Sequence, residues 1–482
     1  SCQILRYLYT LLSIILKMTR WPKRMSPAAY SLLVLLPVLS LLVQPSRGQT
    51  SLYSGYAKKK AGLIDDIPTI TLSNGEHFPQ IGLGVGNLQA NRVENMVYEG
   101  IKAEHRIRLI DTAYASGNEK QVARGIVSGV RRFRKTENYD DPVQVHVVTK
   151  VWYTHLGYNR TKISVKQSLD NLSDAIKDPN VDLRVHILIH WPRCHDAIEW
   201  MNCEGEEAAL PDAIKKAGPP PHLDKKNAWK QSWKALEDMY LSADFPAIAS
   251  IGVSNFGNEE MKELVAMARE KPHMTQINVW SLLFDMHLVD TCNRHNIHIQ
   301  LFNIMNGIIS NVFSAPFAHH HLLRVANWLT KRAPEGNRAV TLSQTVLKWL
   351  LQFGMSIVVR TSDLDHLTQN AAVVLSAVPD MTEEEIGYVA KAAAALIGGE
   401  DVPEDVYVKV SFHAANQDMF LYSVAGPDDF QQIAFVPKGE IYHEQSHPHQ
   451  RFRMYLATDP DVYHDYTVEG KYGDHKEVRV EL

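Results

Sequence analysis

The stretch Val143-Gln144-Val145-His146-Val147-Val148-Thr149-Lys150 is rich in valine and ends on a lysine. Short apolar runs of this kind, separated by longer amphipathic stretches, are typical of strands buried in a parallel sheet. Further runs of the same type lie at 80–85, 106–111, 185–190, 249–254, 275–279, 297–302 and 356–360. Helical patterns follow several of them, at 119–133, 228–241, 259–269 and 341–353.

This alternation of strand and helix patterns decides the expected fold. Eight β/α units over roughly 300 residues favour a (β/α)8 TIM barrel over an open doubly wound sheet. No GxGxxG motif follows a strand, which argues against a Rossmann domain. We therefore predict an α/β chain with a TIM barrel over residues 64–398, followed by a small all-β sandwich domain.

Polar residues stand at the carboxyl ends of the expected strands. They are Asp111, Lys150, His190, Ser254 with Asn255, and Arg360. Any one of them has a structural explanation, since an aspartate can cap a helix and a histidine can be satisfied inside a core. The carboxyl ends of barrel strands converge on one mouth, where active sites are built. Agreement at five strand ends therefore predicts a functional site there.

Length and composition narrow the function classes. The chain has 482 residues, of which 45% are hydrophobic and 22% charged, and a net charge of -4. This length exceeds that of a typical single domain and suits a barrel plus a small module. Neither a nucleic-acid-binding nor a disordered protein fits this composition. A small-molecule site is the expectation that remains.

Residues 1–48 have the pattern of a targeting segment. A basic stretch at 18–24 precedes an apolar run at 28–43 and the small residues at 46–48, as in a secretory signal peptide. We expect the endoplasmic reticulum lumen or the cell exterior. An uncleaved signal anchor that holds the protein at a membrane is the alternative, although the apolar run is short for a span of about 17 to 25 residues.

Cysteines and histidines give weaker signals. The four cysteines are too few for a disulfide scaffold, and either a short bridged loop or two free thiols fits Cys194 and Cys203. His443, His447 and His449 come close together, but no carboxylate completes a ligand set with them. Surface histidines are the better interpretation, so we expect no metal site.

Four segments resemble the signature motifs of the aldo-keto reductase family, in order and in spacing. They are Leu109-Ile110-Asp111-Thr112-Ala113, Thr149-Lys150-Val151-Trp152, Ile189-His190-Trp191-Pro192 and Ile251-Gly252-Val253-Ser254-Asn255-Phe256. The resemblance covers residues 64–398. It implies a barrel that binds NADPH in an extended pose across its mouth and reduces a small-molecule carbonyl by hydride transfer.

The resemblance also implies a catalytic set, of which one member differs. Asp111, Lys150 and His190 match three family positions, whereas Ser116 stands where the family's proton-donating tyrosine belongs. A serine hydroxyl is shorter and far less acidic than a phenol. Three outcomes stay open: proton delivery through water held by Ser116, Lys150 and His190, a substitute role for Tyr114, or a site that binds without useful turnover.

Cofactor and substrate residues follow from the same resemblance. Cofactor contacts are implied for Ser254, Asn255 and Gln276 at the nicotinamide amide, Phe302 under the ring, Arg360 at the 2′-phosphate and Asn370 at the adenine. Substrate contacts are implied for Ser116, Trp152 and Trp191. The segment 303–306 departs from the family's usual pyrophosphate loop, and the insertion at 192–226 is expected to form a long loop over the mouth.

The tail at 404–482 changes to a period of two, which predicts a β-sandwich. Strands are expected at 406–412, 419–424, 432–436, 450–456 and 478–480. The run from Val436-Pro437-Lys438-Gly439-Glu440 to Arg451-Phe452-Arg453 faintly resembles the β domain of the von Hippel-Lindau tumour suppressor. By analogy of fold we expect the module to dock a protein partner. The leading hypothesis is an NADPH-dependent oxidoreductase that carries this module. A catalytically silent nucleotide- or ligand-binding scaffold is the alternative.

Overall fold

The computed structural model describes residues 67–195, 198–279, 286–305, 316–334, 339–398, 408–426, 429–446, 450–469 and 474–480. The expected targeting segment, residues 1–48, lies outside this part of the chain, so secretion or anchoring stays a prediction. No helix among the described residues is both long and apolar enough to cross a bilayer.

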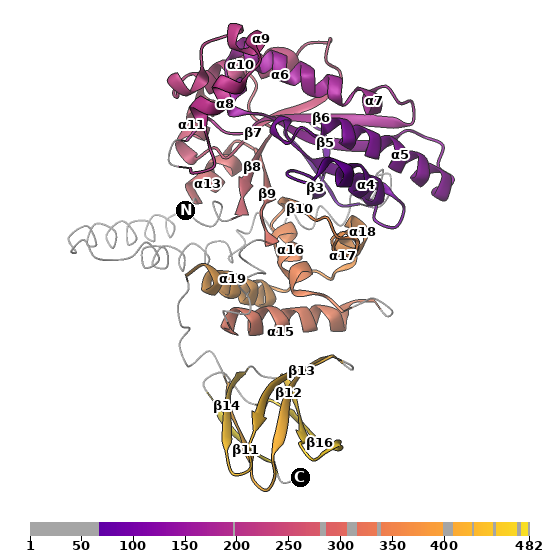
Figure 1. Cartoon of the computed structure of the whole chain (residues 1–482), viewed down its shortest axis with the longest axis vertical. Helices are drawn as coiled ribbons and strands as arrows, with labels where there is room; N and C mark the ends of the chain where they lie inside the picture. The colour runs from indigo at the N-terminus through magenta and orange to yellow at the C-terminus, as the bar shows by residue number, and fades with distance from the viewer. Residues whose placement is uncertain are drawn as a thin grey trace, which may run out of the picture.

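Eight parallel strands close into a barrel, as predicted (Figure 1). They are β3 (Ile81–Gly84), β4 (Leu109–Asp111), β5 (Val143–Val151), β6 (Val181–Ile189), β7 (Ile248–Ser254), β8 (Met274–Asn278), β9 (His298–Phe302) and β10 (Ser356–Arg360). The ring closes because β10 pairs with both β3 and β9. β4 is shorter than predicted, since Arg106 has a φ of 51°, a left-handed conformation in which a strand cannot start.

Helices lie around the barrel and beyond it, on the side of the C-terminal module (Figure 1). They are α4 (Ala90–Ile101), α5 (Glu119–Glu137), α6 (Tyr158–Asn171), α7 (Ser173–Ile176), α10 (Ala228–Tyr240), α11 (Asn258–Met267), α13 (Met286–Arg294), α15 (Pro316–Arg332), α16 (Leu342–Gln352), α17 (Leu364–Gln369), α18 (Ala372–Ala377) and α19 (Glu383–Gly398). α4 and α5 pack closely because Gly125 faces the α4 backbone, where a Cβ would lie 2.7 Å from the Glu94 carbonyl oxygen. A substitution of Gly125 would therefore push the two helices apart.

The inward side chains form layers from the floor of the barrel to its mouth. Side chains alternate along a strand, so every second residue faces the interior. On β5 these residues are His146, Val148 and Lys150, and on β6 they are His186 and Leu188, with His190 next in the same alternation just after the strand ends. The apolar middle layer separates a polar floor from a polar mouth. The alternation of side chains along the strands thus places the candidate catalytic residues Lys150 and His190 inside the barrel, at its mouth.

The floor layer is unusual because it contains histidines in place of branched aliphatic residues. His146 Nδ1 lies 3.0 Å from His186 Nε2, and His186 Nδ1 lies 2.7 Å from Ser250 Oγ. His298 Nε2 pairs with Ser356 Oγ at 2.8 Å. Each imidazole is thus hydrogen-bonded inside the barrel, although it is removed from water.

A hairpin closes the floor from below. Its strands β1 (Thr69–Thr71) and β2 (His77–Pro79) are antiparallel, and the ring of Phe78 lies 4.8 Å from His186 and 5.9 Å from His146. Burial lowers the pKa of His146 and of His298 from 6.5 to about 3, and it lowers the pKa of His186 well below the usual value. The floor histidines are therefore neutral at physiological pH.

The tail folds into two sheets that pack face to face, in agreement with the predicted sandwich. The first is β14 (Ile441–Ser446), β11 (Val408–Ala414) and β17 (His475–Val480), and the second is β13 (Asp429–Val436), β12 (Met419–Gly426), β15 (Arg451–Leu456) and β16 (Asp459–Thr467). Phe412, Leu421, Phe452 and Met454 fill the space between the sheets. The sequence pattern missed β14 and β16, in which polar residues dominate.

Candidate active site

Lys150 and Asp111 form a buried ion pair at the mouth of the barrel. The lysine side chain is 4% exposed and that of the aspartate 13%. Lys150 Nζ donates hydrogen bonds to Asp111 Oδ1 at 2.6 Å and to the Thr112 carbonyl oxygen at 2.7 Å. A buried ammonium needs such partners, because desolvation of an unpaired charge is costly. The structure thus brings together two of the residues that the sequence predicted.

Gln276, expected at the nicotinamide amide, is bound to the ion pair. Its Nε2 atom donates to Asp111 Oδ1 at 2.6 Å and to Gln300 Oε1 at 2.7 Å. Gln300 is fully buried on β9, and sequence reasoning missed it. The signal was a glutamine between Ile299 and Leu301 in an otherwise apolar strand. Gln276 thus holds the aspartate in place, and Gln300 in turn holds Gln276.

His190 follows β6 directly and lies beside the ion pair. Its backbone N–H donates to the Val151 carbonyl oxygen at 3.0 Å, and its ring packs 4.9 Å from that of Trp152. Burial, and after it the charge of Lys150, lowers the pKa of His190 well below the usual value. A neutral imidazole at this point can donate an N–H hydrogen bond to a carbonyl oxygen without carrying a charge.

Ser116 and Tyr114 lie in a single turn, η2 (Tyr114–Ser116), after β4. Ser116 is partly exposed, and a Cβ added at Gly86 would lie 3.7 Å from its Oγ atom. The Tyr114 hydroxyl donates to Gln167 Oε1 on α6 at 2.9 Å, and its ring packs against that of His155, with centroids 4.6 Å apart and planes tilted by 57°. The tyrosine is thus engaged with α6, and this arrangement does not support a substitute role in proton donation.

A polar scaffold fixes the segment that carries these residues. Thr112 Oγ1 donates to Asn118 Oδ1 at 2.5 Å, and Asn118 Nδ2 donates to the Val85 carbonyl oxygen at 2.9 Å. Glu119 is buried and accepts hydrogen bonds from Thr149 Oγ1 and Asn171 Nδ2. The position of Ser116 is therefore set by the same framework that would hold a tyrosine there.

Residues of the expected cofactor site lie along the same rim. Asn255 follows β7 in a left-handed conformation with φ 57°, and its Nδ2 atom donates to the His190 carbonyl oxygen at 3.0 Å. Ser254 is buried at the end of β7, and Phe302 is partly exposed at the end of β9. Arg360 is exposed at the end of β10, where its guanidinium can meet a phosphate.

Asn370 lies apart from the strands, at the end of α17. Its Oδ1 atom is buried and has no hydrogen-bond partner among the described residues. A buried acceptor without a donor is costly unless a ligand satisfies it. The exocyclic amino group of adenine is such a donor, so the residues present fit an adenine nucleotide with a 2′-phosphate.

The insertion at 192–226 is more ordered than the long loop that the sequence predicted. It contains α8 (Cys203–Ala209), α9 (Asp212–Lys216) and the turn η4 (Pro221–Leu223). A disulfide joins Cys194 to Cys203, which resolves the question left open by the sequence, with Cα atoms 5.9 Å apart. The bridge fixes the start of α8 close to the strand end that carries His190.

Helix α8 is anchored to the barrel by two neighbouring glutamates. Glu206 Oε2 accepts a hydrogen bond from Trp152 Nε1 at 2.6 Å, and Oε1 accepts one from the Tyr153 hydroxyl. Glu207 forms a bidentate pair with Arg160, at 2.8 and 2.9 Å, and the arginine side chain is 1% exposed. These contacts hold α8 against the rim beside the predicted substrate wall.

Three tryptophans form that wall. Trp152 and Trp191, both predicted, lie 6.2 Å and 5.9 Å from Trp200 between ring centroids. Trp200 comes from the insertion and is 59% exposed, and sequence reasoning did not single it out. Its exposure indicates an apolar surface beside the mouth that an aromatic or aliphatic substrate can cover.

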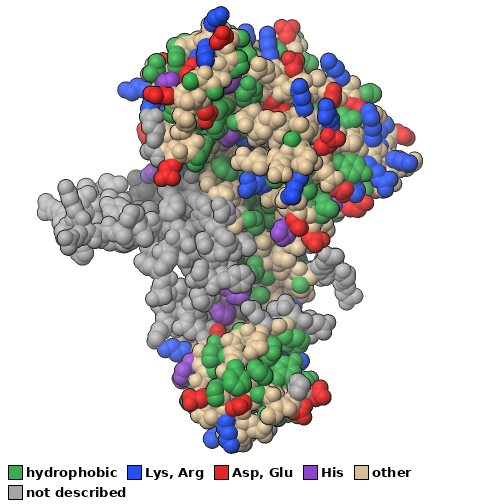
Figure 2. All heavy atoms as spheres, viewed as in Figure 1, with side chains coloured by type: hydrophobic (Ala, Val, Ile, Leu, Met, Phe, Trp, Pro, Cys, Tyr) green, Lys and Arg blue, Asp and Glu red, His purple; other side chains and the backbone are tan. Residues whose placement is uncertain are grey.

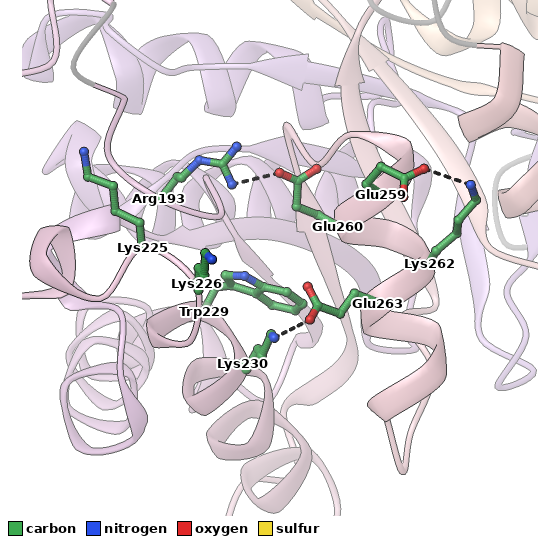
Figure 3. A pocket seen from close by; sticks show the side chains of 9 residues that line it. All are labelled: Arg193, Lys225, Lys226, Trp229, Lys230, Glu259, Glu260, Lys262 and Glu263. Atoms are coloured by element: carbon green, nitrogen blue, oxygen red, sulfur yellow. Dashed lines mark hydrogen bonds and ion pairs between the residues drawn. The ribbon is translucent and has the colours of Figure 1, made fainter.

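A cavity of about 560 Å³ lies where the end of the insertion meets α10 and α11 (Figure 3). Its lining is Arg193, Lys225, Lys226, Trp229, Lys230, Glu259, Glu260, Lys262 and Glu263. Arg193 pairs with Glu260 at 2.8 Å, Lys262 pairs with Glu259 at 2.8 Å, and Lys230 pairs with Glu263. Because carboxylates neutralise three of its cations, we interpret this cavity as a junction that ties the insertion to α11.

Removal of the disulfide is expected to loosen the insertion while the barrel stays intact. In a Cys194→Ser, Cys203→Ser double variant, cleavage by a protease within 195–227 should become about tenfold faster or more, since a bridge of this kind contributes roughly 2 to 4 kcal/mol. Limited proteolysis followed by mass spectrometry measures this. Unchanged cleavage would show that Glu206 and Glu207 suffice to hold α8.

The fold and the site together define a class of protein: a TIM-barrel protein whose candidate active-site residues stand at the carboxyl ends of the strands. Comparison with known proteins gives the family. The sequence profile of the aldo/keto reductase family matches residues 81–394, which is more than half of the chain. The chain belongs to this family, whose members are NADP-dependent oxidoreductases that act on small carbonyl compounds. The match ends before the β-sandwich.

Individual relatives are distant and match somewhat less than two thirds of this chain. The NADPH-dependent aldose reductase of Saccharomyces cerevisiae is 26% identical over 308 residues, which is 63% of this chain and 87% of that protein. The glyoxal reductase of Bacillus subtilis is 27% identical over 310 residues, 63% of this chain and 86% of that protein. A solved structure of a Bombyx mori aldo-keto reductase in complex with NADP is 20% identical, with a TM-score of 0.49, and covers 68% of this chain and 92% of that one.

Proposed function

We propose that this protein reduces a small carbonyl compound to an alcohol with NADPH, and that proton delivery is altered because Ser116 replaces a tyrosine. The observation that carries the proposal is the buried Lys150–Asp111 pair beside a neutral His190 at the barrel mouth. A buried charge pair with a perturbed neighbour in a concave site is typical of catalytic centres.

Each residue has a distinct task in this proposal. NADPH, when bound, supplies the hydride that reduces the carbonyl carbon. Asn255 and Ser254 bind the nicotinamide end, Phe302 packs against the ring, and Arg360 and Asn370 bind the phosphate and adenine end. The neutral His190 donates an N–H hydrogen bond to the substrate oxygen and orients it, while Trp152 and Trp191 hold the rest of the substrate.

The proton for the substrate oxygen must come from elsewhere than a phenol. A serine hydroxyl is a very weak acid, so we propose that water held by Ser116 and Lys150 gives the proton. The oxygen that receives it becomes the alcohol, and the water regains a proton from solvent. Absence of a positioned acid costs about 10²- to 10⁴-fold in rate, so turnover is expected to be slow.

A Lys150→Met variant tests this assignment. Oxidation of NADPH in the presence of 4-nitrobenzaldehyde, followed by absorbance, should be slow with the unmodified protein and should fall by a further factor of about 100 or more in the variant. A Lys166→Met variant on the exposed face of α6 is the matched control and should retain the activity. Equal activity in the two variants would remove Lys150 from the mechanism.

The second candidate function is a silent nucleotide- or ligand-binding scaffold with an interaction module. The observation in its favour is again Ser116, since Tyr114 is held by Gln167 and does not take over the missing role. The two candidates differ in one respect. A scaffold should bind NADPH but give no product under any condition, whereas the slow reductase should form alcohol in proportion to the NADPH consumed.

A further inference from the structure

The outer face of the sheet β13-β12-β15-β16 carries a row of four aromatic side chains that crosses all four strands. Phe420 stands opposite Phe435 on one side and Tyr455 on the other, and Tyr455 stands opposite Tyr463. Ring centroids are 5.1 Å apart for Phe420 and Phe435, and 5.7 Å apart for Tyr455 and Tyr463. We call Phe435, Phe420, Tyr455 and Tyr463 the aromatic row.

The aromatic row faces solvent. Its strand neighbours Leu421 and Met454 are fully buried between the sheets, so the row projects from the opposite face. Phe435 and Tyr463 are each 49% exposed, and Figure 2 shows hydrophobic side chains gathered over the C-terminal module. Large exposed apolar surface of this kind marks a binding site more often than a free surface.

A second row of polar side chains lies next to the first, one pleat further along the strands. Gln432 stands opposite Tyr422, which stands opposite Arg453, and Arg453 stands opposite Asp465. We call these four residues the polar row. Arg453 forms a bidentate pair with Asp465, at 2.6 and 2.7 Å, and its guanidinium lies 4.0 Å from the centre of the Tyr463 ring. The charges of this row thus neutralise one another.

From this juxtaposition we propose that the aromatic and polar rows bind a neutral oligosaccharide. A pyranose ring with equatorial substituents presents a flat C–H face that packs on aromatic rings, while its hydroxyl groups point sideways. The amide of Gln432 and the Arg453–Asp465 pair then supply donors and acceptors for those hydroxyls. Four rings in a line fit a chain of sugars better than a single one.

The same two rows disfavour other classes of partner. Nucleic acids need cations that are free to meet phosphates, whereas the arginine of the polar row is paired with an aspartate. An entirely apolar peptide segment would cover Gln432 and the Arg453–Asp465 pair without satisfying their hydrogen bonds, at a cost in desolvation. A polyol with one apolar face meets both rows.

Isothermal titration of the full chain with cellohexaose, chitohexaose and laminarihexaose tests the proposal. We expect saturable binding of at least one of them, weakened about tenfold or more in a Tyr455→Ala or a Tyr463→Ala variant. The matched Tyr455→Phe variant keeps the ring and should bind within a few-fold of the unmodified protein. His443→Ala, on the other sheet, should leave binding unchanged.

Two results would overturn the proposal. One is the absence of binding to all three oligosaccharides at about 1 mM, a concentration that still detects weak complexes. The other is binding that survives both alanine variants, which would place the sugar elsewhere on the protein. A proline-rich peptide that binds with the same dependence on the rings, while the oligosaccharides do not, would identify a peptide surface in place of a glycan surface.

Discussion

Replacement of Ser116 by tyrosine is expected to raise the rate of aldehyde reduction by about 10²- to 10⁴-fold, the usual contribution of a positioned general acid. The rest of the site is in place for this gain. Lys150 is paired with Asp111 at 2.6 Å, and a nearby ammonium lowers the pKa of a phenol because it stabilises the phenolate. His190 stays neutral and can orient the substrate oxygen.

The structure leaves room for a tyrosine side chain at position 116. Ser116 is partly exposed, and the residue that faces it, Gly86, has no side chain. A tyrosine can therefore extend into the mouth without displacing the scaffold around Asn118 and Glu119. Steady-state reduction of 4-nitrobenzaldehyde at saturating NADPH measures the effect, and the gain should appear in kcat.

The Ser116→Phe variant separates the chemistry of the hydroxyl from the effect of a larger side chain. It fills the same space without a proton to give, so it should remain as slow as the unmodified protein. If Ser116→Tyr is no faster than Ser116→Phe, the defect lies elsewhere. The altered segment 303–306 would then be the first place to examine.

Acid pH should destabilise the barrel through its floor layer. His146 and His298 have pKa values of about 3 in the folded protein and about 6.5 when unfolded. Between these two values the unfolded chain binds protons that the folded barrel excludes. The free energy of unfolding therefore falls as pH is lowered from about 6.5 toward 3, by up to about 1.4 kcal/mol per pH unit for each histidine.

Urea unfolding at a series of pH values between 7 and 4, followed by tryptophan fluorescence, measures this loss. A His298→Asn variant keeps a polar side chain beside Ser356 but cannot take up a proton, so its stability should fall less steeply with acid. The exposed His287→Asn variant is the control and should behave as the unmodified protein does. Parallel slopes in all three proteins would show that carboxylates, and not the floor, govern acid unfolding.

Local sequence patterns were enough to predict the barrel and the two residues of the ion pair at its mouth. The period of two along β5 places His146, Val148 and Lys150 on the face that points into the barrel. A polar residue in this alternation at a strand end can therefore be assigned to the barrel mouth from the sequence. Asp111 and Lys150 were predicted together for this reason. The same reasoning could not find Trp200 or Glu206, because their position depends on how the insertion folds back.

The sandwich shows a related limit of sequence patterns. β16 reads Asp459-Pro460-Asp461-Val462-Tyr463-His464-Asp465-Tyr466-Thr467, with few apolar residues, and it was not recognised as a strand. Its outward face consists of polar and aromatic groups. The sequence of β16 therefore lacks the alternation of apolar and polar residues that is typical of a strand with one buried face. The missed strand contributes Tyr463 and Asp465 to the proposed glycan surface. The residues proposed to bind the glycan are thus the same ones that obscure the strand pattern in the sequence.

Titration of the purified protein with NADPH, followed by quenching of tryptophan fluorescence, tests most directly whether the barrel keeps a working cofactor site around an incomplete catalytic set. Trp152 and Trp191 stand at the mouth and should report binding. We expect saturable quenching with a dissociation constant in the micromolar range or below, and weaker binding of NADH. An Arg360→Ala variant should lose affinity for NADPH but not for NADH. The absence of saturable quenching by NADPH, or equal affinity for the two nucleotides, would contradict the account.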